Sequence, residues 1–170
     1  MIRRGLEWLV DMIQIRRDAI AWARSKGVRV GERSRLLGID RGTFGSEPYL
    51  VKLGDHVTVT GGVRFITHDG GVWVFREEHP DIDIIDPIVV GNNVFIGLGA
   101  ILMPGAEIGD NVVIGAGAVV TGPIPADTVA VGCPARPVKS REEYWKAVQP
   151  RLFHIRARSE AEKRKILTDH

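Results

Sequence analysis

The 170-residue chain has one cysteine, Cys133, so no disulfide can form within it, and a lone thiol is typical of a reducing compartment. Neither sign of charge is in large excess, since 23 Lys and Arg against 21 Asp and Glu give a net charge of +2, and this near balance does not indicate a nucleic-acid partner. No run of about eighteen apolar residues occurs, which predicts no membrane-spanning helix. Residues 1–17 are basic but have neither a long apolar stretch nor a small-residue cleavage site, so they make a poor signal peptide. We expect a single-domain cytoplasmic protein.

The chain does contain a six-residue repeat between Val90 and Pro125. A period of six fits neither an amphipathic helix nor an alternating strand. It is typical of a parallel β-helix, in which three short strands close a triangular coil of about eighteen residues. First-position side chains then stack inside the prism, about 4.8 Å apart in successive coils. The first positions are Val90, Ile96, Leu102, Ile108, Ile114 and Val120, and the small or aliphatic fifth positions are Val94, Ala100, Ala106, Val112, Ala118 and Ile124.

Turn-forming residues stand between these aliphatic positions. Asn92-Asn93 and Asp110-Asn111 each follow a glycine at the second position of a hexad. Glycine and asparagine adopt turn conformations that other residues resist, so we expect corners of the coil at these places. The second-position glycines are Gly91, Gly97, Gly109 and Gly115.

The hexad spacing also appears upstream, at Leu53, Val59 and Phe65, and Val30 opens the first coil. It breaks after Phe65 and resumes only with the main repeat, so residues 68–87 are expected to leave the prism as a long loop. Loops of this length are more often functional than idle. The whole pattern predicts a mainly β fold: an N-terminal helix at 1–27, a β-helix at 28–139 that carries the loop, and a helical extension at 140–170.

The N-terminal helix is predicted from an amphipathic stripe over residues 1–26, after which Gly27 is a stop signal. One interpretation is that it packs on the first coil or on a neighbouring subunit. The other is that it lies on a membrane surface, because several arginines accompany Trp8 and Trp22. The sequence leaves both open.

The C-terminal segment follows two prolines, Pro134 and Pro137, which end the repeat. Residues 140–149 are predicted to form a helix with Ser140 as its N-cap and acidic residues in its first turn. A basic helix is expected at 151–167, with its charges forming a solvated face.

One of the five histidines stands out as a candidate for acid–base chemistry. His68 lies in the segment FITHDGG, where the regular coil gives way to the long loop. A residue there is held by a rigid strand on one side and faces a cleft on the other. Since the imidazole titrates near neutral pH, His68 is a candidate general base.

Four motifs carry a family resemblance: the hexads, FGSEPYL, ITHDGGVWVF and the ending VGCPARPVK. Over residues 28–139 the chain resembles the hexapeptide-repeat acyltransferases and is most similar to bacterial sugar and polysaccharide O-acetyltransferases. The resemblance implies a left-handed β-helix, acetyl-CoA as acyl donor with no metal, a carbohydrate acceptor, and a homotrimer with its sites in grooves between adjacent prisms. It also makes His68 the catalytic base, which takes the hydroxyl proton of the acceptor in a direct transfer.

The resemblance also implies contacts with the coenzyme A part of the donor, from hexad backbone, from one turn and from a basic pair that suits the cofactor's phosphates. Many relatives carry lysine at the position of Gly122, so we expect one phosphate contact fewer in this chain. Backbone N–H groups near Gly97 or Gly99 are candidates to hold the oxyanion. The implied cofactor residues are Leu98, Ala116, Thr121, Gly122, Arg136 and Lys139.

Four residues of the loop and of the irregular segment 38–50 are candidates to bind the acceptor. Glu47 would orient the imidazole or bind a sugar hydroxyl, and Trp73 can stack on a sugar face. Asp69 is expected to point away from its neighbour His68, since successive residues of a strand face opposite sides. The alternative, in which Tyr49 and Trp73 only pack the loop and the trimer interface, stays open.

Other functions also stay open at this point. Transfer could go to the amine of a nucleotide-linked amino sugar, or through Cys133 as an acyl carrier, although this thiol lies in the turn that ends the repeat. A γ-type carbonic anhydrase on a similar prism would need three histidines converging on zinc, and residues 90–130 contain none. A non-catalytic solenoid would leave His68 and the long loop without a purpose. No residue identifies the acceptor.

Overall fold

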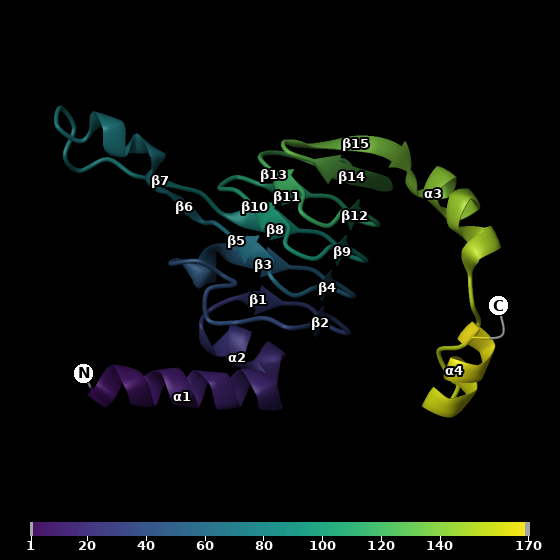
Figure 1. Ribbon diagram of the computed structural model, residues 1–170. Coiled ribbons are helices and arrows are strands. Elements are labelled where there is room, and N and C mark those ends of the chain that lie inside the picture. Colours follow the sequence, from purple (N-terminus) through teal and green to yellow (C-terminus); the bar gives the residue numbers. More distant parts are fainter. Residues whose placement is uncertain (1, 169–170) are drawn as a thin grey trace.

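The computed structural model describes residues 2–168, with side chains described from Glu7 onward. Its centre consists of three sheets through which the chain passes in turn (Figure 1). The first sheet has the order β1 (Arg29–Val30), β3 (Val51–Leu53), β8 (Ile88–Val90) and β11 (Glu107–Ile108). The second has the order β15 (Ala135–Ser140), β14 (Thr128–Gly132), β12 (Val113–Ile114), β9 (Phe95–Ile96), β4 (Thr58–Val59) and β2 (Arg35–Leu36). The third has the order β13 (Val119–Val120), β10 (Ile101–Leu102) and β5 (Arg64–Phe65).

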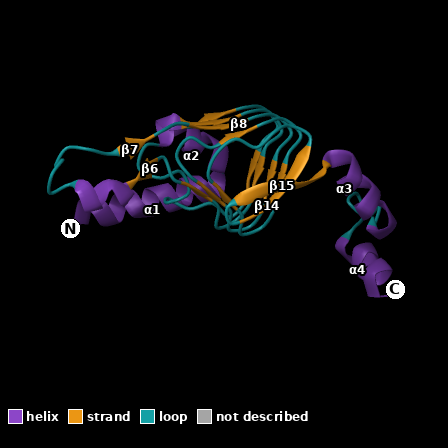
Figure 2. Cartoon of the chain, turned by 90° about the horizontal axis from the view of Figure 1, so that it is seen from above, coloured by secondary structure: helices purple, strands orange, loops and turns teal. Residues whose placement is uncertain are grey.

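In the main repeat, one passage through the three sheets is a coil of eighteen residues, as the hexads predict. Phe95 pairs with Val113 in the second sheet, and Ile101 pairs with Val119 in the third, both in parallel. Seen along the stack, strands of successive coils lie over one another around a common interior (Figure 2). In these three sheets, β15 pairs antiparallel with β14 at one edge of the second sheet, and the other strand pairs are parallel. The coils therefore form one continuous stack, which we call the coil stack (residues 28–67 and 88–132).

The interior of the coil stack is made of the aliphatic positions of the repeat. Every first-position and fifth-position side chain of the hexads between 90 and 124 is at most 5% exposed. The upstream positions Leu53, Val59 and Phe65 are at most 2% exposed. Because burying such a side chain contributes about 1.5–3 kcal/mol, these layers are the main source of the stability of the fold. The predicted core is confirmed.

The second-position glycines do not form the turns that the sequence analysis expects of them. None of the four has a positive φ, which falls instead on residues such as Gly99 and Gly117. A Cβ atom at Gly97 would lie 2.5 Å from the backbone nitrogen of Ala116 in the next coil. The hexads therefore need glycine at this position because the backbones of successive coils approach closely.

A column of polar side chains runs along the corner between the first and second sheets. His56 Nδ1 lies 2.8 Å from Asn93 Oδ1, Asn93 Nδ2 donates to Asn111 Oδ1 at 2.8 Å, and Asn111 Nδ2 donates to Asp127 Oδ1 at 3.2 Å. All four residues have φ between 54° and 59°, so the turn role expected for Asn93 and Asn111 is confirmed. We call this column the polar ladder.

The N-terminal segment forms two helices, where the sequence predicts one. α1 (Ile2–Arg17) and α2 (Ala19–Ser25) are separated by Asp18, whose extended backbone breaks the helix and whose side chain accepts a hydrogen bond from the Ala21 N–H at 2.9 Å. Trp22 of α2 is buried, with its ring centroid 6.4 Å from that of Phe44. α2 therefore covers the first coil, while Trp8 on α1 remains half exposed. No helix within residues 2–168 is long and apolar enough to cross a membrane.

The C-terminal segment leaves the stack after β15. α3 (Arg141–Val148) begins at Ser140, whose hydroxyl accepts from the Glu143 N–H while the Glu143 carboxylate accepts from the Ser140 N–H, so the predicted N-cap is confirmed. A 3-10 turn, η3 (Gln149–Arg151), follows. The basic helix expected at 151–167 is wrong in its first half, because α4 spans only Glu160–Thr168.

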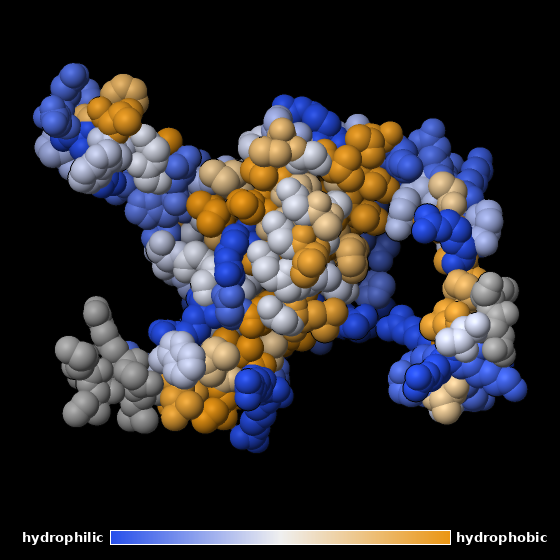
Figure 3. All heavy atoms as spheres, viewed as in Figure 1, coloured by the Kyte–Doolittle hydropathy of each residue, from blue (hydrophilic) through white to orange (hydrophobic). Residues whose placement is uncertain are grey.

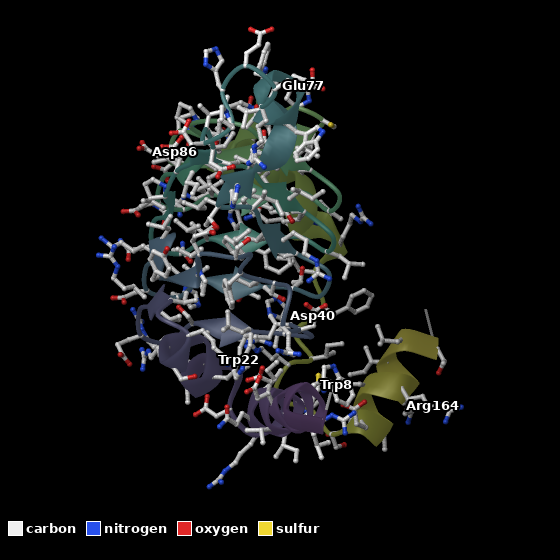
Figure 4. The ribbon with its side chains drawn as sticks, turned by 90° about the vertical axis from the view of Figure 1, so that its left-hand side faces the viewer. Trp8, Trp22, Asp40, Glu77, Asp86 and Arg164 are labelled. Atoms are coloured by element: carbon white, nitrogen blue, oxygen red, sulfur yellow. The ribbon has the colours of Figure 1, made fainter. Side chains whose placement is uncertain are left out.

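Residues 68–87 leave the stack as a two-stranded arm, which we call the hairpin arm (Figure 1). β6 (His68–Asp69) pairs antiparallel with β7 (Ile84–Ile85), and the 3-10 helix η2 (Gly70–Phe75) lies between them. Apolar side chains are exposed at the outer part of this arm among hydrophilic ones, including Val74 and Phe75 (Figure 3). Figure 4 views the arm from its outer side, with Glu77 and Asp86 labelled.

Candidate functional site

His68 lies where the hairpin arm joins the coil stack. Phe65 and Thr67, which precede His68 in the same segment, are both fully buried. Since side chains alternate along an extended chain, burial of Thr67 turns the His68 side chain outward, and 30% of it is exposed. The imidazole therefore has a rigid base and an open side.

Two carboxylates face the two ring nitrogens of His68. Nε2 lies 2.9 Å from Asp83 Oδ1, and Nδ1 lies 3.5 Å from Glu47 Oε1. The hydrogen bond with Asp83 is the main cause that raises the pKa of His68 above its ordinary value, and the Glu47 carboxylate adds to it. The same contact lowers the pKa of Asp83. The site thus favours a positively charged imidazole when nothing else is bound.

The Glu47 side chain is held in place by the hydroxyl of the buried Thr67. Its second oxygen, Oε2, accepts a hydrogen bond of 2.9 Å from Thr67 Oγ1. The Glu47 side chain is 15% exposed and precedes the short 3-10 helix η1 (Pro48–Leu50). This geometry brings Glu47 to the imidazole and suits the orienting role expected from the sequence.

Asp83 belongs to the hairpin arm and was not among the residues expected from the sequence. Arg76 Nη2 forms an ion pair with the Asp83 carboxylate, and Arg76 Nε donates to the carbonyl of Ile82 at 3.3 Å. The guanidinium also lies 5.6 Å from the ring centroid of Trp73. The segment DIDIIDP holds three aspartates, and only the pairing of His68 with Ile85 decides which of them meets the imidazole.

The other acceptor candidates lie around this centre without a described contact to the imidazole. Asp69 Oδ1 accepts from the Gly71 N–H at 2.9 Å and caps η2. Trp73 is 71% exposed on the arm, and Tyr49 is 59% exposed in η1. Of the four candidates, the structure brings Glu47 into contact with His68 and links Trp73 to it through Arg76 and Asp83.

The candidate cofactor residues fall into three separate places. Leu98 and Ala116 lie on the edge where the chain enters the third sheet, and the Gly117 N–H donates to the Leu98 carbonyl at 2.8 Å. Thr121 and Gly122 leave the same sheet at its other edge, where residues 66–68 also leave it. A single chain therefore does not gather these residues into one pocket. The remaining two, Arg136 and Lys139, lie on β15 of the second sheet.

The expected oxyanion donors are already engaged. The Gly97 N–H donates to the Ile114 carbonyl at 2.8 Å, and the Gly99 N–H donates to the Gly61 carbonyl at 3.0 Å. Both bonds hold successive coils together, so neither of these two N–H groups is free to hold an oxyanion. Cys133 is exposed in the turn between β14 and β15, on another sheet than the hairpin arm. Within the described part of the chain, no three His, Cys, Asp or Glu residues are grouped as a metal ion would require.

Known proteins resemble the chain over most of its length. Residues 87–122 match the family described as bacterial transferase hexapeptide, with six repeats. Protein CapG of Staphylococcus aureus is 56% identical over 121 residues, which are 71% of this chain and 70% of that protein. A maltose O-acetyltransferase from Clostridium difficile 630 has a similar structure, with a TM-score of 0.54 and 30% identity over 71% of this chain and 73% of its own.

A galactoside acetyltransferase in complex with coenzyme A gives a TM-score of 0.56 at 28% identity. That match covers 77% of this chain but only 61% of the galactoside enzyme. The repeat, the stacked sheets and these relatives all indicate the same family. The chain belongs to the hexapeptide-repeat acyltransferase family.

Proposed function

We propose that this protein is an acetyl-CoA-dependent O-acetyltransferase that modifies a hydroxyl of a sugar or polysaccharide precursor, with His68 as general base. The observation that carries the proposal is the imidazole of His68, held at the junction of stack and arm with Nδ1 toward an anchored carboxylate. The complex of a related enzyme with coenzyme A and the names of the sugar-modifying relatives support the donor and the acceptor class. We also carry over the left-handed sense of the coil and a place of action in the cytoplasm.

In the mechanism, Glu47 orients the base and His68 moves the proton. Glu47 accepts a hydrogen bond from Nδ1–H of the neutral imidazole, which leaves Nε2 as the nitrogen with the lone pair. Nε2 then accepts the hydroxyl proton as the acceptor oxygen attacks, and a base of this kind contributes about a hundred- to ten-thousand-fold in rate. Acetyl-CoA, when bound, would supply the thioester carbonyl that is attacked. Its C–S bond breaks as the ester forms, and the proton on Nε2 passes to the departing coenzyme A thiolate.

The residues proposed for the donor fit it chemically. Leu98 is 65% exposed and offers an apolar surface to a pantetheine arm. Arg136 Nη1 donates to the Ala135 carbonyl at 2.8 Å, which leaves its other guanidinium N–H groups for a phosphate. Lys139 lies on the same strand and adds a second cation, although the Glu143 carboxylate interacts with it. Thr121 and Gly122 add a backbone turn on the edge of the sheet from which His68 also departs.

The separation of these residues within one chain supports an oligomeric site. Leu98 and Ala116 lie on the opposite edge of the third sheet from Thr121 and Gly122, with His68 near the second pair. A groove between adjacent copies would bring the two edges together, as in the homotrimer that the family resemblance implies. Light scattering coupled to gel filtration would give the mass directly, and a monomer that is active would contradict this arrangement.

The test of the function is a screen of hydroxyl and amine sugars with acetyl-CoA, read by thiol release. We expect transfer to a hydroxyl, and a loss of about a hundred- to ten-thousand-fold in kcat for His68→Ala with coenzyme A binding retained. His154→Ala is the matched control, because His154 is exposed beyond α3. Cys133→Ala, which removes the rival nucleophile, is expected to stay active. Near-normal turnover of His68→Ala would remove His68 from the mechanism, and activity on amines alone would indicate an N-acetyltransferase.

A further inference from the structure

The hydrogen-bonding pattern around His68 is that of an imidazolium. An ionised carboxylate only accepts hydrogen bonds, so a ring nitrogen that faces one needs a proton. Asp83 lies at hydrogen-bond distance from Nε2, and Glu47 lies at a longer distance from Nδ1. When both contacts are made, neither ring nitrogen has a lone pair to offer. A general base in this arrangement is blocked, so one of the two contacts must be released before catalysis.

Asp83 is the carboxylate that is free to leave. The Glu47 side chain is 15% exposed and is fixed by the buried hydroxyl of Thr67, whereas the Asp83 side chain is 37% exposed. Asp83 also lies on the hairpin arm and not on the coil stack, and its partner Arg76 belongs to the same arm. Movement of the arm or of this side chain would therefore free Nε2 and leave the Nδ1 contact in place.

Nε2 is also the nitrogen that the proposed function assigns to the acceptor. An acceptor hydroxyl must come within about 2.6–3.2 Å of the base that takes its proton. Asp83 Oδ1 occupies a point 2.9 Å from Nε2. The carboxylate oxygen and the acceptor oxygen therefore compete for one place.

We propose that Asp83 is a positioning residue that holds the place of the acceptor hydroxyl at His68 Nε2 in the free enzyme and gives it up when the acceptor binds. This inference rests on the proposed function of His68 as the base. As Asp83 withdraws, the Nε2 proton passes to solvent water, and the neutral imidazole is then able to accept the hydroxyl proton. Arg76 keeps the displaced carboxylate ionised and within the arm. Asp83 thus raises the pH above which the His68 imidazole of the free enzyme is neutral and able to act as a base.

The charged groups around the imidazole determine the direction of the pH effect. Asp83 comes from the arm before β7, Glu47 from the segment before η1, and Arg76 follows η2 and reaches His68 only through Asp83. Asp69 is the neighbour on β6, and its described hydrogen bond is to the backbone of η2. Removing the negative charge at position 83 leaves Glu47 as the only carboxylate at the ring among the described residues. The imidazole should then lose its proton at lower pH.

The experiment is an NMR titration of the His68 imidazole in the full chain without acceptor, for wild type, Asp83→Asn and Asp81→Asn. Asp81 is an exposed aspartate of the same segment and makes the matched control. We expect the His68 midpoint to move to lower pH in Asp83→Asn and to stay in place in Asp81→Asn. Adding the acceptor found in the screen should move the wild-type midpoint in the same direction. Equal midpoints for wild type and Asp83→Asn would overturn the proposal.

The pH dependence of kcat/KM is the second readout. For Asp83→Asn, the ratio of variant to wild-type kcat/KM should exceed one at low pH and approach one at high pH, where His68 is neutral in both. A tenfold or greater loss at high pH would show that Asp83 is required for the reaction itself, and would also overturn the proposal. The titration needs no turnover. Failure of the proposed function would therefore appear in the His68→Ala assay, separately from failure of this inference.

Discussion

Substituting Gly97 by alanine tests whether the glycines of the repeat are there for close contact between coils. The added Cβ would lie 2.5 Å from Ala116 N, 2.8 Å from the Gly115 carbonyl carbon and 2.8 Å from the Ile114 carbonyl oxygen. All three atoms belong to the backbone of the next coil, so no side chain can rotate away. To reach an ordinary contact of 3.4 Å with the nitrogen, the coils must separate locally by about 0.9 Å.

This separation also strains hydrogen bonds that hold the coils together, including the one from the Gly97 N–H to the Ile114 carbonyl. Overpacking of this kind destabilises a protein by about 1–3 kcal/mol. For a chain of this size, each kcal/mol lowers Tm by about 2–4 °C. We therefore expect Gly97→Ala to lower Tm by roughly 2–12 °C. Thermal unfolding followed by circular dichroism at one fixed protein concentration measures the shift.

Two further glycines make the comparison decisive. A Cβ at Gly122 would meet no atom within 4 Å, and Gly122 has no positive φ, so alanine there should be neutral or stabilise by about 0.4–1 kcal/mol. A Cβ at Gly99 also meets no atom within 4 Å, but φ is +68°, which costs about 1–2 kcal/mol for a residue with a side chain. If Gly97→Ala and Gly122→Ala unfold at the same temperature, the argument from coil spacing is wrong.

Two other predictions concern the stability of the fold. Leu102→Ala leaves a cavity between Phe65 and Val120 in the interior of the coil stack and should lower the free energy of unfolding by about 2–5 kcal/mol. Leu98→Ala, at a position 65% exposed, should change it by less than about 0.5 kcal/mol. Equal effects of the two substitutions in urea denaturation would contradict the assignment of Leu102 to the core and Leu98 to the surface. Arg64 holds the pKa of the Asp40 carboxyl below its usual range through two hydrogen bonds, of 2.6 and 2.8 Å. A lowered pKa means that this stabilisation is present above the unfolded-state pKa and is lost as pH falls through the folded-state value, so Asp40→Asn should reduce Tm at pH 7 and flatten its decline below about pH 4. An acid decline of Tm parallel to that of the wild type would contradict this.

The repeat allowed the core to be predicted almost residue by residue, because a six-residue period leaves one choice of inward-facing positions. Its local chemistry was harder to infer. Glycine is compatible with both a turn and a close contact, and only the distance from Gly97 to the next coil separates the two. The helix break at Asp18 was missed because apolar residues continue on both sides of it, so the periodicity is not interrupted.

Of the candidate site, the sequence predicted the residue whose place in the repeat is distinctive, and it missed those whose role depends on contacts distant in sequence. His68 stands at the boundary of the repeat, and this boundary is visible in the sequence. Asp83 is one of three aspartates in a short segment, and its selection depends on the pairing of β6 with β7, which no local pattern specifies. The anchoring of Glu47 by Thr67 was hidden for the same reason, since the two residues are twenty positions apart.

The polar ladder gives the stack a direction that its aliphatic interior lacks. Asp127 can only accept, which fixes the orientation of the Asn111 amide, then that of Asn93, and finally makes His56 Nδ1 the donor. The ladder thus has a donor at its His56 end and an acceptor at its Asp127 end, so its hydrogen bonds all run in one direction along the corner.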